Sequence, residues 1–227
     1  MPHLFSSRDL VLREDASEWD VVSSSVGVTR DRLLLIKQVH GVEVALARRG
    51  TASWSRPQAD SVVTDDPAVA IGVRTADCAP ILLFDPVRHV AGAIHAGWRG
   101  TAAGAAGSGV AAMVKEFGTR PADLIAAIGP CLSACCGEVG PDVLDAFRAG
   151  GADASSLSAW FTPGTADRSF LDLDGANRDQ LVRAGLDPAA IHVSGLCTRT
   201  HHERFHSYRA AREHAGRLLA AIRVPAS

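Results

Sequence analysis

A succession of short apolar segments between residues 33 and 94 constrains the fold of this chain more than any other feature. They span 33–36, 42–47, 61–63, 69–73, 81–84 and 90–94, and the later ones are bounded by Asp, Pro or Gly. Short apolar or β-branched runs between such residues are typical of strands. We expect the first two to be joined at the His40-Gly41 turn, where Gly supplies backbone freedom. This density of strands predicts a sizeable mixed sheet.

The pattern becomes helical after Gly100. Residues 101–117 are rich in Ala and end at Gly118, which predicts one helix with a C-terminal stop. Apolar spacing predicts two further helices, at 141–149 and 172–184, and two further core strands, at 124–128 and 193–196. The remaining segments predict a short strand or two before residue 33, a surface loop at 150–164, and a tail from Tyr208 that is either a helix or a buried strand.

The composition fits a single domain over residues 1–227, because 47% of the chain is hydrophobic and 21% is charged. A balance of 23 Lys and Arg against 25 Asp and Glu removes the electrostatic reason to expect nucleic acid or an anionic membrane as partner. No apolar run approaches the ~18 residues of a membrane span, and charges occupy the place of a signal peptide's apolar stretch. We expect a monomeric, cytoplasmic protein with a small-molecule substrate.

The five cysteines are an odd number in a chain too large to need disulfide stabilisation, so we interpret them as thiols. Three of them, Cys131, Cys135 and Cys136, lie close together in the sequence. No fourth ligand lies within sequence reach of this group, which favours packing over metal binding.

Three apolar segments carry residues that could bind a metal: Lys37 to His40, Thr75 to Cys78, and Ala93 to His95. His40, Cys78 and His95 form a plausible zinc set, and three protein ligands would leave an open position, as in catalytic zinc sites. Spacing alone does not establish the set, because the sheet must bring distant ligands together. Two alternatives remain: hydrogen-bonded turn histidines with Cys78 as core filler, or a nucleophilic Cys78 with His95 or His40 as its base.

Six sequence blocks carry a resemblance that covers about two thirds of the chain: KQVHG (37–41), ADSVVT (59–64), TADCAPILLFD (75–85), AIHAGWRGTAAG (93–104), AIGPCLSACCGEVG (127–140), and CT followed by FHSYR (197–198 and 205–209). They resemble the successive signatures of the YfiH-like laccase-domain family, also called multicopper polyphenol oxidoreductases. The resemblance implies an α/β fold with a central mixed sheet flanked by helices, as an α/β/β/α sandwich. It also implies that His40, Cys78 and His95 are the metal ligands.

The same resemblance implies a purine nucleoside phosphorylase that acts on adenosine, inosine and methylthioadenosine and also deaminates adenosine. The sequence departs from the family pattern at Gly137 and His206, where aromatic residues are usual, and in a shorter N-terminal part. These departures leave the metal ligands intact and bear on substrate preference. A non-catalytic sensor or cell-wall editing factor that binds nucleotide-like molecules is a further alternative.

Under the phosphorylase hypothesis, six residues besides the ligands are candidates for roles at the site. Phosphate would be bound by arginine through its planar donor fork, at Arg74, Arg99 or Arg209. Asp77 could orient a ligand imidazole or exchange protons with substrate. Trp98 could stack on the purine and Gln38 could hydrogen-bond its edge. The structural alternatives are salt bridges for the arginines, a strand cap for Asp77, core packing for Trp98 and backbone pairing for Gln38.

The expected cofactor is zinc, with copper as an alternative occupant of the same three ligands, since divalent copper outcompetes zinc at most N/S sites. A four-copper laccase is not expected, because none of the nine histidines stands in an H-x-H motif. Copper at the His40, Cys78 and His95 site would account for weak polyphenol oxidation. We interpret His201, His202 and His206 mainly as exposed loop residues, and His206 as the one that could line the pocket.

Overall fold

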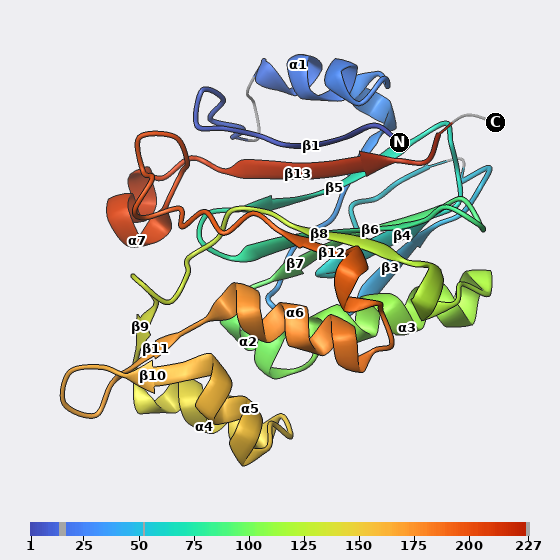
Figure 1. Cartoon of the computed structure of the whole chain (residues 1–227). Helices are drawn as coiled ribbons and strands as arrows, with labels where there is room; N and C mark the ends of the chain where they lie inside the picture. The colour runs from blue at the N-terminus through green and yellow to red at the C-terminus, as the bar shows by residue number, and fades with distance from the viewer. Residues whose placement is uncertain (14–16, 52, 226–227) are drawn as a thin grey trace.

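Two mixed sheets lie face to face between outer layers of helix in the computed structural model, which describes residues 1–13, 17–51 and 53–225 (Figure 1). The first sheet has the order β1 (His3–Phe5), β13 (Leu218–Arg223), β5 (Ala70–Thr75) and β2 (Leu33–Leu35). Only β2 and β5 are parallel in it. The N-terminal and C-terminal strands are therefore direct neighbours.

The second sheet is the larger one. Its order is β12 (Ile191–Val193), β8 (Ile125–Ile128), β6 (Ala79–Asp85), β7 (Val90–Ala96), β4 (Ser61–Thr64) and β3 (Val44–Ala47). Every residue of β6 and β7 is buried, because this sheet is covered on both faces. A small third sheet has the order β10 (Phe161–Pro163), β11 (Ser169–Leu171) and β9 (Glu138–Val139).

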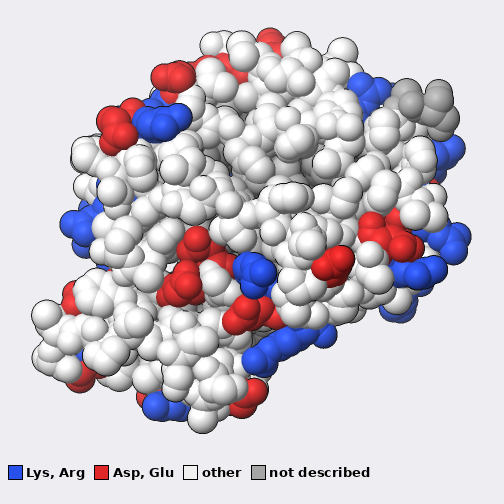
Figure 2. All heavy atoms as spheres, viewed as in Figure 1, with Lys and Arg blue, Asp and Glu red and all other residues white. Residues whose placement is uncertain are grey.

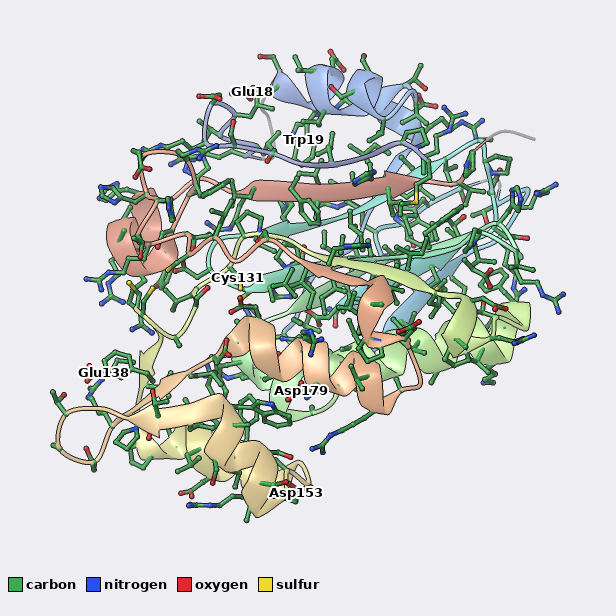
Figure 3. The ribbon with its side chains drawn as sticks, viewed as in Figure 1. Glu18, Trp19, Cys131, Glu138, Asp153 and Asp179 are labelled. Atoms are coloured by element: carbon green, nitrogen blue, oxygen red, sulfur yellow. The ribbon has the colours of Figure 1, made fainter. Side chains whose placement is uncertain are left out.

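Helices cover the outer face of each large sheet, which gives the expected α/β/β/α sandwich. On the first sheet lies α1 (Glu18–Ser25), whose buried Trp19 points toward β13 (Figure 3). On the second sheet lie α2 (Trp98–Ala102), α3 (Ala105–Phe117) and α6 (Leu173–Arg183). The remaining helices are α4 (Pro141–Ala149), α5 (Ala154–Trp160) and α7 (Tyr208–Ala211), with 3₁₀ turns η1 (Arg30–Arg32), η2 (Pro121–Asp123), η3 (Pro188–Ala190) and η4 (Arg212–His214).

The apolar core lies in three layers that follow this arrangement. Between the two sheets, residues such as Val62, Ile71, Leu82 and Ile222 are almost fully buried. Removal of this apolar surface from water, at ~25 cal/mol per Å², holds the sheets together. The charged residues that Figure 2 shows on one face are of both signs and interspersed. That view agrees with the balanced charge of the sequence.

Several sequence expectations are confirmed, and four are wrong in detail. The strands at 33–35 and 44–47 exist, but they belong to different sheets and do not form a hairpin. The helix expected at 101–117 is interrupted at Gly104, whose φ of 87° is left-handed. The expected loop at 150–164 contains α5 and β10, because Asp153 caps a helix through the N–H of Ser156.

The fourth error concerns the last expected core strand, at 193–196. The strand is β12, it ends at Val193, and its side chains are largely exposed because it lies at the sheet edge. Helix α1 was not expected from the weak pattern before residue 33. The ambiguous tail contains both alternatives, a short helix at 208–211 and the buried strand β13.

Candidate metal centre and cavity

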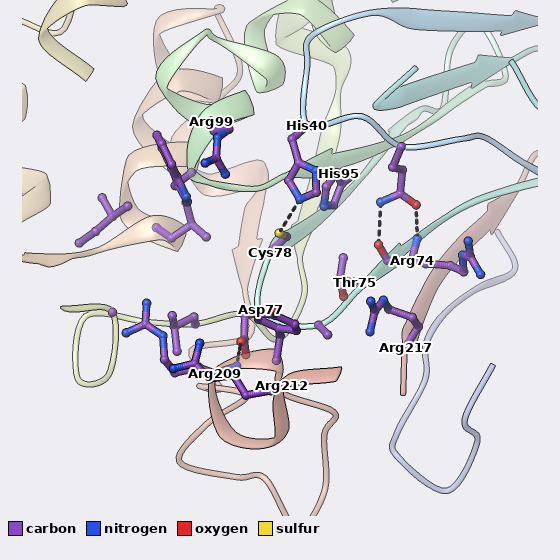
Figure 4. A pocket seen from close by; sticks show the side chains of 18 of the residues that line it. His40, Arg74, Thr75, Asp77, Cys78, His95, Arg99, Arg209, Arg212 and Arg217 are labelled. Atoms are coloured by element: carbon purple, nitrogen blue, oxygen red, sulfur yellow. Dashed lines mark hydrogen bonds between the residues drawn. The ribbon is translucent and has the colours of Figure 1, made fainter. Parts of the chain in front are cut away.

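The three expected ligands converge at one end of the sandwich. His40 lies between β2 and β3, and Cys78 lies between β5 and β6, so both occupy segments that pass from the first sheet to the second. His95 is the penultimate residue of β7. Their potential ligand atoms all lie within 4.8 Å of one another, with Cys78 Sγ 4.0 Å from His40 Nε2 (Figure 4). The fold therefore brings together residues far apart in the sequence.

A buried carboxylate, Asp60, organises this centre. One of its oxygens lies 2.8 Å from His95 Nδ1, and the same oxygen accepts the backbone N–H of His40 at 2.9 Å. The other accepts the N–H groups of Val39 and Gly41 at 3.1 and 2.7 Å. These bonds hold the turn at His40, whose φ is 62°, and direct Nε2 of His95 toward the other ligands.

Burial and mutual hydrogen bonds shift the pKa values of Cys78, His95 and Asp60 at this centre. Burial opposes ionisation of Cys78, yet hydrogen bonds from His40 and His95 lower the pKa of its thiol to about 6. Burial also disfavours the charged ring of His95, but its bonds to Asp60 and Cys78 raise its pKa to about 9. The pKa of Asp60 is lowered in spite of burial, by His95 and the surrounding N–H groups. The protonated ring of His95 is therefore favoured between the thiolate of Cys78 and the carboxylate of Asp60.

The donor set fits a zinc ion or another cation that prefers nitrogen and sulfur. Gly97 leaves space at the centre, since a methyl group there would lie 2.8 Å from Cys78 Sγ and 3.1 Å from His40 Cδ2. Three ligands also leave a position for a further one. That position faces a cavity, because all three residues line it.

The cavity has a volume of about 940 Å³ and a strongly cationic wall. This volume is at the upper end of the range for small-molecule sites. Among the described residues, a single carboxylate, Asp77, lines it. The positively charged side chains that line it are Lys37, Arg56, Arg74, Arg99, Arg209, Arg212 and Arg217. Figure 4 labels the last five of them. The cavity is therefore suited to an anionic ligand or co-substrate.

The other predicted site residues also line this cavity, and Gln38 and Trp98 each contact one of the predicted arginines. Gln38 donates to the carbonyl of Arg74 at 2.7 Å and accepts its N–H at 2.9 Å, which is the backbone pairing considered from the sequence. Trp98 packs partly against the core, and the guanidinium of Arg99 lies 4.1 Å from its ring centroid. This stacking fixes Arg99 at the cavity wall.

The carboxylate that contacts a ligand imidazole is that of Asp60, and the hydrogen bonds of Asp77 go to other groups. Asp77 accepts the hydroxyl of Thr198 at 2.7 Å and the backbone N–H of Arg209 at 2.5 Å. The guanidinium of Arg209 donates to the carbonyl of Glu138 at 2.9 Å. Asp77 thereby attaches the start of α7 to the turn that carries Cys78.

Sequence reasoning missed Asp60 and four of the cationic residues, Lys37, Arg56, Arg212 and Arg217. Asp60 stands directly before the apolar run at 61–63 and within the ADSVVT block, but neither signal assigned it a role. His206 is buried rather than exposed, and its Nε2 bonds the carbonyl of Leu10 at 2.9 Å, outside the cavity. Cys131 is buried in the core, as expected of a packing residue.

The fold and the site together define an α/β/β/α protein with an open three-ligand metal centre on a cationic cavity. The chain belongs to the laccase-domain family of enzymes, described as multi-copper polyphenol oxidoreductase laccase, whose sequence model matches residues 15–225. Two solved structures share the fold. The YfiH protein of Bacillus licheniformis superposes with a TM-score of 0.88 at 27% identity, covering 98% of this chain and 92% of that one. YlmD of Geobacillus stearothermophilus superposes with a TM-score of 0.84 at 28% identity, covering 99% of this chain and 90% of that one.

Curated relatives carry two enzyme names. A protein of Deinococcus radiodurans named purine nucleoside phosphorylase is 38% identical over 90% of this chain and 75% of its own length. One of the same name from Bacteroides thetaiotaomicron is 36% identical, and the match spans 73% of this chain and 60% of that protein. A protein from an unknown prokaryotic organism, named adenosine deaminase, is 33% identical over 88% of this chain and 78% of its own length.

In the described part of the chain, no helix combines the length and the apolar character that crossing a bilayer requires.

Proposed function

We propose that the protein is a zinc-dependent purine nucleoside phosphorylase that also deaminates adenosine. The observation that carries this proposal is the opening of a His-Cys-His centre onto a cavity lined by seven Lys and Arg side chains. Phosphorolysis needs an anion beside a nucleoside, and the cavity offers both the charge and the volume. The names of the relatives support the same chemistry.

In phosphorolysis, a phosphate oxygen bonds to the anomeric carbon of the ribose as the bond from that carbon to the purine nitrogen breaks. The electron pair leaves with the purine, which takes up a proton, and ribose 1-phosphate remains. In this proposal Arg99 and Arg209 bind the phosphate, which is supported by the contacts of their guanidinium groups with Trp98 and the carbonyl of Glu138. Cys78, His40 and His95 would hold the ion, and Asp60 would orient His95.

A zinc ion in this centre would supply Lewis acidity at its open position. That chemistry suits deamination, in which water replaces the amino group at C6 of adenosine and ammonia leaves. The two activities would share one purine site and differ in their need for phosphate.

The decisive experiment combines metal analysis with an assay of phosphate dependence. We expect about one zinc at the His-Cys-His centre, and free base with ribose 1-phosphate from inosine only when phosphate is present. Adenosine should yield inosine without phosphate. His40→Ala, Cys78→Ala and His95→Ala should each abolish both reactions, whereas His192→Ala, at an exposed position of β12, should leave them unchanged. Turnover that survives in the three ligand variants would refute the proposal.

A second candidate is a metal-independent cysteine hydrolase. The specific observation in its favour is the chain of contacts from Cys78 through His95 to Asp60, the order of groups in a nucleophile, base and orienting acid. The two candidates separate cleanly. If a chelator leaves activity intact and iodoacetamide abolishes it, the hydrolase is correct; loss on chelation with recovery on zinc addition supports the phosphorylase.

Copper at the same centre would give the polyphenol oxidation that the family description names. Oxygen uptake with a phenol, before and after copper loading, tests it. A four-copper arrangement finds no support in the donor residues: within residues 1–13, 17–51 and 53–225, the only other potential metal-binding cluster consists of three cysteines.

A further inference from the structure

Three thiols meet outside the cavity centre, at a place where two loops lie side by side. Cys135 and Cys136 lie in the loop between β8 and β9, and Cys197 lies in the segment after β12. Their sulfur atoms lie within 4.8 Å of one another, and those of Cys135 and Cys136 are 3.6 Å apart. The hydroxyl oxygen of Thr200 lies 3.3 and 3.5 Å from the sulfurs of Cys135 and Cys136. We call this group the thiol cluster.

Backbone pairing, rather than chance contact of side chains, holds the thiol cluster together. The N–H of Cys131 donates to the carbonyl of Leu196 at 3.2 Å, and the N–H of Thr198 donates to the carbonyl of Cys131 at 2.9 Å. The N–H of Cys136 closes a turn on Ser133 at 3.0 Å. None of the three thiols is in a disulfide. The sulfur atoms are thus presented together by two fixed stretches of chain.

We propose that the thiol cluster is a second metal site, which binds one thiophilic d¹⁰ cation, Zn²⁺ or Cu⁺, through Cys135, Cys136 and Cys197. Thiolates at ~2.3 Å around one such ion lie roughly 3.8 Å apart, close to the 3.6 Å between Cys135 and Cys136 and within the 4.8 Å that bounds the group. Soft sulfur ligands select these two ions. Each thiol that binds releases its proton to solvent as its metal–sulfur bond forms, and no electron is transferred. The hydroxyl of Thr200 adjoins a fourth position.

Access and burial suit such a site. Cys197 is 4% exposed, Cys136 is half-buried and Cys135 is exposed, so an ion would enter from solvent past Cys135. The sequence alone favoured packing of Cys131, Cys135 and Cys136, because no fourth ligand lies within sequence reach of these three residues. The fold replaces Cys131 with Cys197, which lies 61 residues beyond Cys136.

The position of the site gives it a structural role. Arg209 donates to the carbonyl of Cys136 at 3.4 Å, and Thr198, next to Cys197, donates to Asp77. An ion in the thiol cluster would therefore join the two loops that hold Arg209 and Asp77 at the cavity wall. Because it binds only the folded arrangement, it would stabilise the protein by mass action.

The test uses the full chain with Cys78→Ser, which weakens the first centre, under anaerobic conditions with a phosphine reductant. Zn²⁺ and Cu⁺ are titrated separately against chromophoric chelators, and Co²⁺ is added to read thiolate-to-metal charge transfer. We expect one tightly bound equivalent of at least one of the two ions, and charge-transfer intensity from three thiolates. The melting temperature should rise with the ion that binds.

Adding Cys135→Ser to this background should weaken binding at least tenfold and remove the melting-temperature rise. This variant keeps the test valid if Cys197→Ser fails to fold, since Cys135 is exposed. Thr200→Val is the matched control, and it should leave the three-thiolate signal intact. The proposal is overturned if neither ion binds, if Cys135→Ser and Cys136→Ser leave the affinity unchanged, or if the cysteines only form a disulfide in air. These outcomes are independent of catalysis.

Discussion

Asp60 connects both histidine ligands through one side chain. It is fully buried, and its two oxygens accept three backbone N–H groups of the His40 turn as well as contacting the ring of His95. A carboxylate is the side chain that can accept in all these directions. The same group fixes the path of the chain at one ligand and the ring orientation at another.

Asp60→Asn should weaken zinc binding by about 10- to 100-fold, the usual effect of removing a partner that orients a ligand. The amide keeps the shape of the side chain but turns an N–H₂ group toward donors, which leaves buried N–H groups without an acceptor. Competition with a chromophoric chelator measures the affinity. Asp142→Asn, on the exposed side of α4, is the control. Equal affinity in wild type and Asp60→Asn would contradict the orienting role.

Gly97→Ala should weaken metal binding at least tenfold, about 1.4 kcal/mol. The φ of −72° permits alanine, so the effect would come from the methyl group 2.8 Å from Cys78 Sγ. Gly107→Ala is the matched control, because nothing lies within 4 Å of its methyl position in α3; it should stabilise the helix by roughly 0.5–1 kcal/mol. Metal titration and thermal unfolding of both variants provide the comparison.

The ligands could be predicted from sequence because motif resemblance acts residue by residue. Asp60 could not, since its role depends on two hydrogen-bonding groups 20 and 35 residues away in the chain. The cationic wall was missed in part for the same reason. Arg56, Arg212 and Arg217 come from segments with no periodic pattern, and only the folded structure shows that they line one cavity.

At the scale of elements, the segment before α7 is fastened to the N-terminal stretch through His206. Burial lowers the pKa of this ring, and the charges of Arg8, Arg217 and Arg13 lower it further against the bond to Leu10. The neutral ring is therefore the form that fits the folded protein. Through this bond, the segment before α7 contacts the N-terminal stretch close to the start of β13.

The folded protein should lose stability in acid because of this histidine. Its folded pKa lies below the unfolded value of about 6.5, so the unfolded chain binds the proton first. The stabilising effect is complete above about pH 6.5 and is lost as the pH falls through the folded pKa. Denaturant unfolding at about pH 7.5 and 5.5 measures it, and His206→Phe should flatten the difference. An equally steep loss in His206→Phe would show that other groups are responsible.

Elements were predictable where the apolar pattern was long or its ends were marked. The helix at 141–149 matched α4 because Pro141 and Gly150 mark its two ends. The interruption at Gly104 was missed because Gly inside an Ala-rich run is tolerated in a helix. Strand pairing was the larger failure: nothing local to residues 33–47 shows that its two strands enter different sheets.

At the scale of the whole molecule, the metal centre depends on the contact between the sheets. His40 and Cys78 lie on two of the segments that pass between them, so the relative position of the sheets sets the distance between these ligands. Packing between the sheets is therefore part of the construction of the site. A loss of packing should affect both stability and metal affinity.

Ile71→Ala, at a fully buried position of β5 between the sheets, should reduce the free energy of unfolding by about 2–5 kcal/mol. Urea unfolding of the metal-free protein measures this change. Val193→Ala, 37% exposed on β12, should cost less than about 1 kcal/mol. If both variants lose a similar amount of unfolding free energy, the apolar layer between the sheets does not contribute more to stability than the exposed sheet edge.

The last strand of the chain, β13, is an interior member of the first sheet, between β1 and β5. During synthesis, β5 and the turn with Cys78 leave the ribosome long before their neighbour at residues 218–223 has been translated. One edge of β5 therefore stays unpaired until residues 218–223 have been translated. Completion of the sheet beside the metal centre thus has to wait for a segment more than 140 residues further along the chain than β5.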